Sequence, residues 1–273
     1  MDDQDPAWFD QLPVLPQSVR EIVAIVNDPA TPLSRLVEVL ARDPVASARV
    51  VAAANTAFFA RHQAVHGIDE AALRLGMDRV RVLVTATLLA GRLRPGACPG
   101  FDPARFWRAS MTVALCASKL ANYVVVEREA PAAYLAGLLH NIGLLAAACA
   151  FPDPADRALR RAAKEGVSVD AAHAETLGVG TRALGAQALR HWGLPEAIVV
   201  AVEHQHDPAY GGEWSRLATL VGVSAQWRRG DFQGRPDARL LRGISNVKLE
   251  NIGASCRREV AGLGSFAASL AAA

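Results

Sequence analysis

The chain has 273 residues and a mass of 29.0 kDa, long enough for one or two domains with a substantial core. Hydrophobic residues make up 51% of it and charged residues 21%, a balance that excludes an intrinsically disordered chain. With 29 basic and 27 acidic residues the net charge is only +2. Charge therefore gives no reason to expect a nucleic-acid or membrane partner.

Helical periodicity dominates from the N-terminal end onward. In residues 19–26 and again in residues 33–40, apolar side chains recur at i, i+3, i+4 and i+7, which is the spacing of one helix face. Residues 217–221 continue the same pattern. No segment shows the sustained alternation of a half-buried strand. The predicted fold class is all-α and multi-helical.

Helix start and stop signals agree with this period. Asp-Pro pairs stand before helical patterns at residues 43–44, 102–103 and 153–154. Asp can accept hydrogen bonds from free backbone N–H groups, and Pro has no N–H to leave unpaired. Glycines follow four helical runs, at Gly76, Gly166, Gly178 and Gly193. A left-handed residue commonly ends a helix at such positions.

The most boundary-like stretch is residues 92–102, which contains two prolines and two glycines in its middle. It divides the chain into an N-terminal helical lobe, residues 1–100, and a second helical lobe, residues 101–230. A polar, Gly-containing stretch then precedes residues 231–273, which we expect to form a C-terminal helical tail with weaker patterning.

Residues 132–151 are nearly long enough and apolar enough to span a bilayer. His140 and Asn141 stand at their middle, and basic anchors are missing from their flanks. A buried core helix is the favoured interpretation. The acidic N-terminus does not resemble a secretory signal, and the four cysteines lie far apart without a Cys-x-x-Cys pair. We expect a cytoplasmic protein without a membrane partner.

His140 and Asn141 are the first site candidates. The predicted helix around them is apolar on all sides and therefore buried on all sides. Leaving either polar side chain unpaired there would cost roughly 1–3 kcal/mol. Two interpretations stay open: a histidine satisfied inside the core beside a helix-bending asparagine, or a working or vestigial ligand site.

A second cluster, residues 203–207, ends the helix that Pro195 begins. His204 and His206 are two positions apart, so on a helix they would lie on different faces and could not share one metal as an i, i+4 pair does. His204 is either favoured by the helix dipole at this end or part of a pocket. Three Arg-Arg pairs, at residues 160–161, 228–229 and 257–258, are interpreted as solvated faces.

Several segments together resemble the HDOD family, a bacterial offshoot of the HD phosphohydrolase superfamily. In the first lobe these are LPVLPQSVREIVAIVNDP, LARDPVASARVVAAANTAFF and GIDEAALRLGMDRVRVLV. In the second they are FWRASMTVA, YLAGLLHNIGLL and AETLGVGTRALGAQALRHWGLPEAIVVAVEHQHDP. They occur in the order of the family and cover roughly residues 12–227. The resemblance implies an HD-like helical scaffold in the second lobe.

The ligand set implied by the superfamily is depleted here. Its first His falls near Ala109, its His-Asp pair is His140-Asn141, and its closing Asp falls near Ala225. A further His that the family often shows is replaced by Thr181. An amide has no negative charge and cannot bridge two cations as a carboxylate does. The second lobe is therefore interpreted as a degenerate HD-like lobe.

This depletion favours a non-catalytic, regulatory module that binds without cleaving bonds, with no cofactor. As degenerate-site or pocket residues we predict His140, Asn141, Glu175, Thr181, Trp192 and His204. Glu175 is expected to pair with a buried donor. The family implies unidentified signalling proteins as partners, with a nucleotide as another candidate ligand and no nucleic acid. The alternative is a metal-dependent phosphohydrolase acting on nucleotides or cyclic dinucleotides.

Overall fold

The computed structural model describes residues 11–12, 14–28, 30–41, 43–55, 65–75, 77–124, 129–236 and 239–272. Throughout these ranges the only regular secondary structure is helical: fourteen α-helices, with short 3₁₀ segments such as η3 (Arg239–Leu241). The predicted all-α fold class is confirmed.

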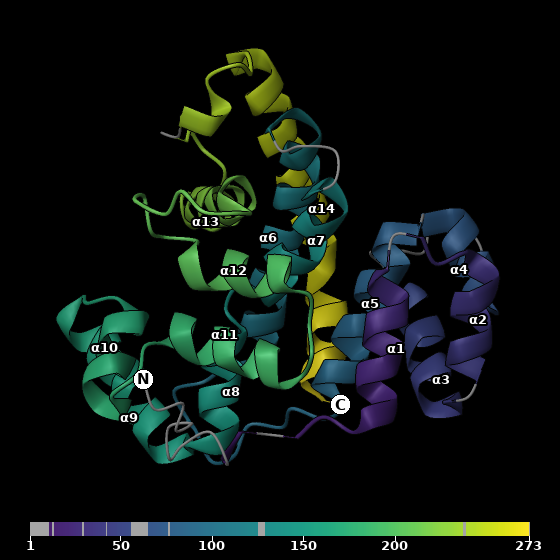
Figure 1. Cartoon of the computed structure of the whole chain (residues 1–273), viewed down its shortest axis with the longest axis horizontal. Helices are drawn as coiled ribbons and strands as arrows, with labels where there is room; N and C mark the ends of the chain where they lie inside the picture. The colour runs from purple at the N-terminus through teal and green to yellow at the C-terminus, as the bar shows by residue number, and fades with distance from the viewer. Residues whose placement is uncertain are drawn as a thin grey trace.

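Five helices form the N-terminal lobe, drawn in purple to blue in Figure 1: α1 (Gln17–Asn27), α2 (Leu33–Ala41), α3 (Pro44–Ala54), α4 (Ile68–Leu75) and α5 (Met77–Ala90). The periodic positions of α1 are all buried, at 6% exposure or less. In α2, Leu36 and Leu40 are fully buried, whereas Leu33 and Val37 are only partly covered. Burial of one apolar face is what stabilises helices this short.

The second lobe contains α6 (Pro103–Val124), α7 (Ala130–Leu139), α8 (Ile142–Ala150), α9 (Pro152–Glu165), α10 (Val169–Leu177), α11 (Thr181–His191), α12 (Glu196–His204) and α13 (Ser215–Arg229). Helices α6 and α7 pack side by side at its centre; α13 packs against both, and α12 packs against α7 and α13. Helices α8 to α11 form the lower part of this lobe in Figure 1.

The last helix, α14 (Asn246–Ala271), joins the two lobes. It packs along α6 and also contacts α5. Its inner face buries Leu249, Cys256, Leu263 and Phe266. The segment expected as a weakly patterned tail is therefore the longest helix described, with 26 residues, and part of the core.

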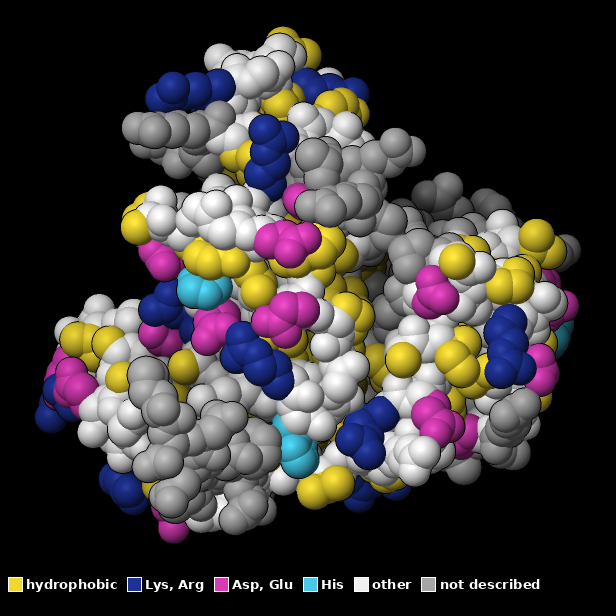
Figure 2. Space-filling model, in the orientation of Figure 1, with side chains coloured by type: hydrophobic (Ala, Val, Ile, Leu, Met, Phe, Trp, Pro, Cys, Tyr) yellow, Lys and Arg dark blue, Asp and Glu magenta, His cyan; other side chains and the backbone are white. Residues whose placement is uncertain are grey.

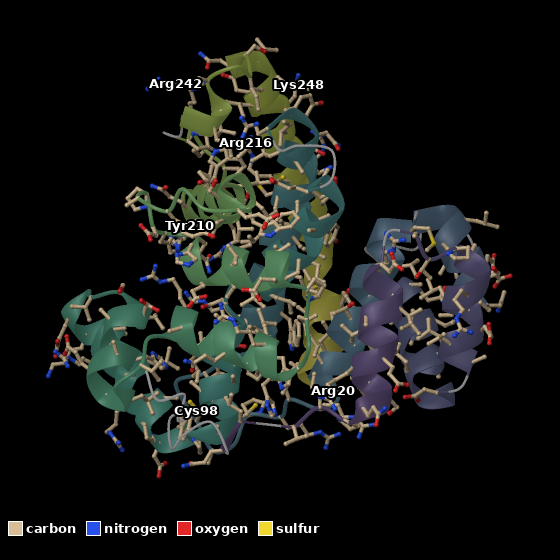
Figure 3. All side chains as sticks on the ribbon, in the orientation of Figure 1. Arg20, Cys98, Tyr210, Arg216, Arg242 and Lys248 are labelled. Carbon is tan, nitrogen blue, oxygen red and sulfur yellow. The ribbon has the colours of Figure 1, made fainter. Side chains whose placement is uncertain are left out.

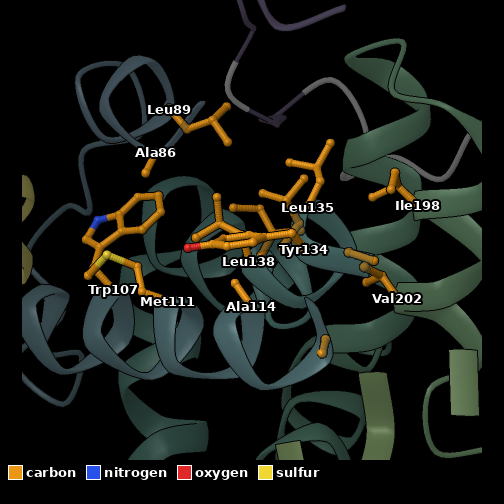
Figure 4. Packing of buried hydrophobic residues seen from close by; sticks show 14 of the residues in the cluster. Ala86, Leu89, Trp107, Met111, Ala114, Tyr134, Leu135, Leu138, Ile198 and Val202 are labelled. Carbon is orange, nitrogen blue, oxygen red and sulfur yellow. The ribbon is translucent and has the colours of Figure 1, made fainter. Parts of the chain in front are cut away.

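A continuous apolar core runs between these elements, and Figure 4 shows part of it. Side chains from α5, α6, α7 and α12 meet there, including Ala86, Leu89, Trp107, Met111, Tyr134, Leu138 and Val202. Trp107 and Trp192 are among the largest fully buried side chains. Because aromatic rings bury large apolar areas, these two anchor a core that is otherwise mostly aliphatic.

Most of the predicted helix boundaries agree with the structure. Helices α3 and α6 begin at the prolines of their Asp-Pro pairs. Gly166, Gly178 and Gly193 have φ values of 70°, 75° and 72° just past helix ends, whereas Gly76 lies outside the described residues. One start is wrong: α9 begins at Pro152, two residues before the proline of its Asp-Pro pair. Pro152 itself supplies the fixed φ of a first helical residue.

The apolar segment around His140 is not one helix. It is long and apolar enough to be a candidate membrane span, but 72% of the best window, Ala132–Ala150, is buried inside the fold. His140 and Asn141 form a turn that separates α7 from α8. The prediction of a buried core segment is supported, while the expectation that both residues lie inside a continuous helix is wrong.

Candidate functional site

The α7–α8 turn places His140 and Asn141 at the junction of two buried helices. His140 is the C-cap of α7 and keeps 9% exposure. Its Nδ1 lies 2.9 Å from the carbonyl oxygen of Gly137. From the end of α12, the side chain of Gln205 reaches across and donates a hydrogen bond of 2.6 Å to the main-chain oxygen of His140. The junction is thus tied to α12.

His140 is held neutral. Burial lowers its pKa to about 3, and the positive charges of Arg228 and Arg229 and the nearby His206 act in the same direction. A neutral ring that faces a carbonyl oxygen must carry its proton on Nδ1, so Nε2 keeps a free lone pair. His140 can therefore accept a hydrogen bond through Nε2, or donate that lone pair to a cation.

Asn141 is the N-cap of α8 but its side chain makes no capping hydrogen bond. Helix α8 then passes very close to α11, because a Cβ atom at Gly143 would overlap the carbonyl oxygen of Thr181. The approach fixes the site turn against the start of α11. Only glycine allows this contact between two helix backbones.

Thr181 stands at the first position of α11 and contacts a polar network beside the turn. Its hydroxyl donates to Asp170 Oδ1 at 3.1 Å. The same carboxylate accepts from the backbone N–H of Arg182 at 2.9 Å and from its guanidinium at 3.0 and 3.2 Å. Thr181 and Asp170 together position α10 against α11, next to the α8 contact.

Glu175 and Trp192 lie away from the α7–α8 turn. Glu175 forms an ion pair with Arg161 of α9, and the two side chains are 53% and 40% exposed. The expectation of a buried donor for Glu175 is therefore wrong: its partner is on the surface. Trp192, at the end of α11, is 1% exposed and belongs to the main core. Glu175 therefore belongs to a surface ion pair between α9 and α10, and Trp192 to the apolar core.

His204 ends α12 and stacks on Tyr210, with ring centroids 3.9 Å apart and planes 12° apart. Its Nδ1 lies 3.5 Å from Asp207 Oδ2. Tyr210 in turn donates its hydroxyl hydrogen to the carbonyl oxygen of Glu213. His204 thus shapes the loop between α12 and α13.

A cavity of about 710 Å³ opens between this loop and α13. Its lining includes Gln205, His206, Tyr210, Thr219, Gln226 and Leu240. Figure 3 labels Tyr210 and Arg216, a further lining residue, on this side of the molecule. The size is within the ordinary range of small-molecule sites, and the wall mixes apolar and hydrogen-bonding groups.

Arginines gather where α6 begins and α13 ends. Arg228 feels the positive charges of Arg229, Arg105 and Arg108, and burial together with these charges lowers its pKa below the ordinary arginine value. Its Nε atom is shielded from solvent and has no hydrogen-bond partner. The interpretation of residues 228–229 as a solvated face therefore holds for Arg229, which is exposed, and is wrong for Arg228, which is partly buried beside other arginines.

The donors at the turn do not fit a pair of divalent cations. They are one imidazole, on His140, and one amide, on Asn141. Within the ranges that the structure describes, no three His, Cys, Asp or Glu side chains come together as a metal site requires. Arg228 and Arg229 add positive charge beside His140, which disfavours a cation further.

Sequence reasoning missed Gln205, which bonds to His140, and the two α6 arginines that approach Arg228. Gln205, Arg105 and Arg108 were not singled out, although Arg105 and Arg108 are three apart and so share a helix face. No sequence signal shows that Arg105 and Arg108 approach Arg228, because both are more than 100 residues away from it along the chain. Tertiary packing alone brings them together.

The sequence and the fold of this chain are similar to those of several known proteins. The chain is 27% identical to a Shewanella amazonensis protein named provisionally as a phosphohydrolase, with a TM-score of 0.72 over 97% of this chain and 95% of that one. It is 26% identical to a Marinobacter aquaeolei protein named provisionally as a signal transduction protein, with a TM-score of 0.81 over 99% of this chain and 62% of that one.

A curated Treponema pallidum relative of uncharacterised function is 23% identical over 79% of this chain. This chain spans only 42% of that relative's length. The family model of the HDOD domain matches residues 12–208. These residues include all of the N-terminal lobe that the structure describes and the second lobe through α12. The chain belongs to the HDOD domain family.

Proposed function

We propose that this chain is a non-catalytic regulatory module of a bacterial signalling system, and that it acts by binding a protein or a small ligand. Membership of the HDOD family and the likeness to a protein named for signal transduction support this role. The relatives described above are bacterial. A cytoplasmic location belongs to the same proposal.

The donor set at the α7–α8 turn is the observation on which the proposal depends. Activating water with metal ions requires several anionic or imidazole ligands at one place. This turn offers a single imidazole and a neutral amide, with arginine charges nearby. Such a site favours anions and hydrogen-bonding groups over divalent cations.

A phosphohydrolase is the second candidate, favoured by the provisional name of the Shewanella relative and by the free Nε2 of His140. In that case His140, Asn141 and His204 would belong to an unusual ligand set for a nucleotide or cyclic dinucleotide substrate. The two candidates differ in what they require of the protein: bound metal and turnover in one, and neither in the other.

The test measures the metal content of the purified protein and the release of p-nitrophenol from bis-p-nitrophenyl phosphate in the presence of Mn²⁺ or Fe²⁺. The wild type, His140→Ala and the matched control His66→Gln, on an exposed N-terminal-lobe histidine, are compared. We expect substoichiometric metal and no release above the blank in all three. Stoichiometric metal with turnover that only His140→Ala abolishes would establish the phosphohydrolase instead.

A further inference from the structure

The basic cluster described above comes from two helix ends. Arg105 and Arg108 lie in the first two turns of α6, and Arg228 and Arg229 lie in the last turn of α13. The positions on α13 are favourable, because the carbonyl end of a helix attracts cations. The positions on α6 are not, since the N-terminal end of a helix carries partial positive charge. The helix dipole therefore explains only half of the cluster.

These four arginines are also uncompensated. Elsewhere in the second lobe charges are matched: Arg182 pairs with Asp170 and Arg190 with Glu203. Figure 2 shows basic and acidic side chains next to one another over α11 and α12. By contrast, no ion pair of the described residues includes the guanidinium group of Arg105, Arg108, Arg228 or Arg229, although the Asp102 carboxylate accepts from the backbone N–H of Arg105 at 3.0 Å.

The cluster offers donors that nothing in the described part of the chain accepts. The Nε of Arg228 is buried and has no hydrogen-bond partner among the described residues. Buried unpaired donors and like charges at close range both cost free energy, so each requires an explanation, and a bound ion or ligand is one that would satisfy both. Guanidinium groups are planar forks that match the oxygen pairs of phosphate.

A cavity large enough for the remainder of such a ligand adjoins the cluster. His206 lines the cavity and at the same time feels the charges of Arg229 and Arg182. On α13, the cavity-lining Gln226 is three residues before Arg229, so the two lie on adjacent turns of one face. The four arginines do not line the cavity themselves, but its α13 wall leads along this face to Arg229.

We propose that Arg105, Arg108, Arg228 and Arg229 bind the phosphate groups of a small phosphorylated ligand of nucleotide size, whose remainder occupies the cavity between α13 and the α12–α13 loop. This deepens the proposed binding function and rests on it. Four arginines favour a ligand with two or more phosphate charges over a monoanion. Tyr210 and His206 in the cavity wall would contact the part of the ligand that is not phosphate.

The test uses isothermal titration of the full chain with pyrophosphate, with adenosine diphosphate and with adenosine. We compare the wild type with the double variant Arg108→Gln/Arg229→Gln, in which both side chains are exposed, so that the fold should survive. The matched control is Arg20→Gln/Arg242→Gln, which removes the same charge at two exposed arginines labelled in Figure 3, one in α1 and one just after η3.

We expect pyrophosphate and adenosine diphosphate to bind the wild type and the control with equal affinity. Both should bind the site variant at least about tenfold more weakly. Adenosine should bind none of the three proteins. Binding to the wild type should also weaken between about 50 and 300 mM NaCl, a measurement that needs no variant. Equal affinity in both double variants, or no binding of either phosphate compound to the wild type, overturns the proposal. If poly-glutamate, titrated in the same way, binds and neither phosphate compound does, the proposal is overturned in favour of an acidic protein partner.

The two proposals fail separately. If adenosine diphosphate binds through the arginines and is also hydrolysed, the non-catalytic function is wrong while the phosphate site stands. If no phosphate compound binds and the protein still shows neither metal nor turnover, the phosphate site is wrong while the non-catalytic function stands.

Discussion

The side-chain Nε2 of Gln205 donates a hydrogen bond of 2.6 Å to the main-chain oxygen of His140. It donates a second hydrogen bond, of 3.0 Å, to the main-chain oxygen of Val202. Gln205 is 6% exposed, so no solvent can replace these bonds. One amide therefore closes the end of α12 and holds the α7–α8 turn against it. The site geometry depends on this contact as much as on His140 itself.

Replacing Gln205 with Leu should destabilise the protein by about 1–3 kcal/mol, because it leaves two buried carbonyl oxygens unpaired. Urea denaturation followed by circular dichroism measures the change. The control is Gln226→Leu, at an exposed position of α13, for which we expect a change within about 0.5 kcal/mol. Equal effects of the two substitutions would show that the Gln205 contact does not stabilise the turn.

Gly143→Ala should be more disruptive than its single added methyl suggests. The Cβ atom would overlap the backbone of Thr181 and Gly185, so α8 and α11 would have to separate. Overpacking of this kind typically costs about 1–3 kcal/mol. Thermal unfolding compares it with Gly243→Ala, where nothing lies within 4 Å of the new atom. A Gly143→Ala protein as stable as the wild type would refute the close approach of the two helices.

The neutral His140 predicts how stability depends on pH. Its folded pKa of about 3 lies below the ordinary value of 6.5, so between these values the unfolded chain binds the proton that the folded protein excludes. The stability that the neutral His140 contributes to the fold is therefore fully present above pH 6.5 and is lost as the pH falls towards 3. Burial lowers the pKa of His173 as well, which adds in the same direction.

We expect the free energy of unfolding to fall by about 2 kcal/mol more in the wild type than in His140→Gln between pH 7.5 and 5. Urea titrations at the two pH values measure this difference. Parallel pH profiles for the two proteins would mean that His140 is protonated normally in the folded state.

The basic cluster predicts a variant that gains stability. Removing like charges with Arg108→Gln/Arg229→Gln should raise the free energy of unfolding of the ligand-free protein by about 1 kcal/mol at low salt, and less at high salt. The control Arg20→Gln/Arg242→Gln should stay within about 0.5 kcal/mol of the wild type. A loss of stability in the first variant alone would show that these arginines serve the fold.

Local signals in the sequence predict much of this fold. The apolar period of α1 and the prolines at the starts of α3 and α6 act within a few residues, so their effects are visible in one sequence. The start of α9 differs by two residues because Pro152 competes with the Asp-Pro pair that follows it. For α14, burial against α6 and α5 compensates for a weak period.

The site could be predicted only in part. The sequence identified His140 and Asn141 as polar residues in an apolar segment, but the turn between α7 and α8 depends on contacts with Gln205 and with α11, which are distant along the chain. The sequence does not show that Glu175 pairs with Arg161, because that ion pair depends on how α9 packs on α10. Convergence of distant residues is a tertiary property.

Titration of the wild-type protein with Mn²⁺, followed by calorimetry, tests whether the α7–α8 turn lacks a site for divalent cations. We expect no saturable binding at micromolar concentration, because a lone imidazole beside arginines is a poor cation site. Saturable binding of one or two ions per chain, lost in His140→Ala and retained in His66→Gln, would contradict it.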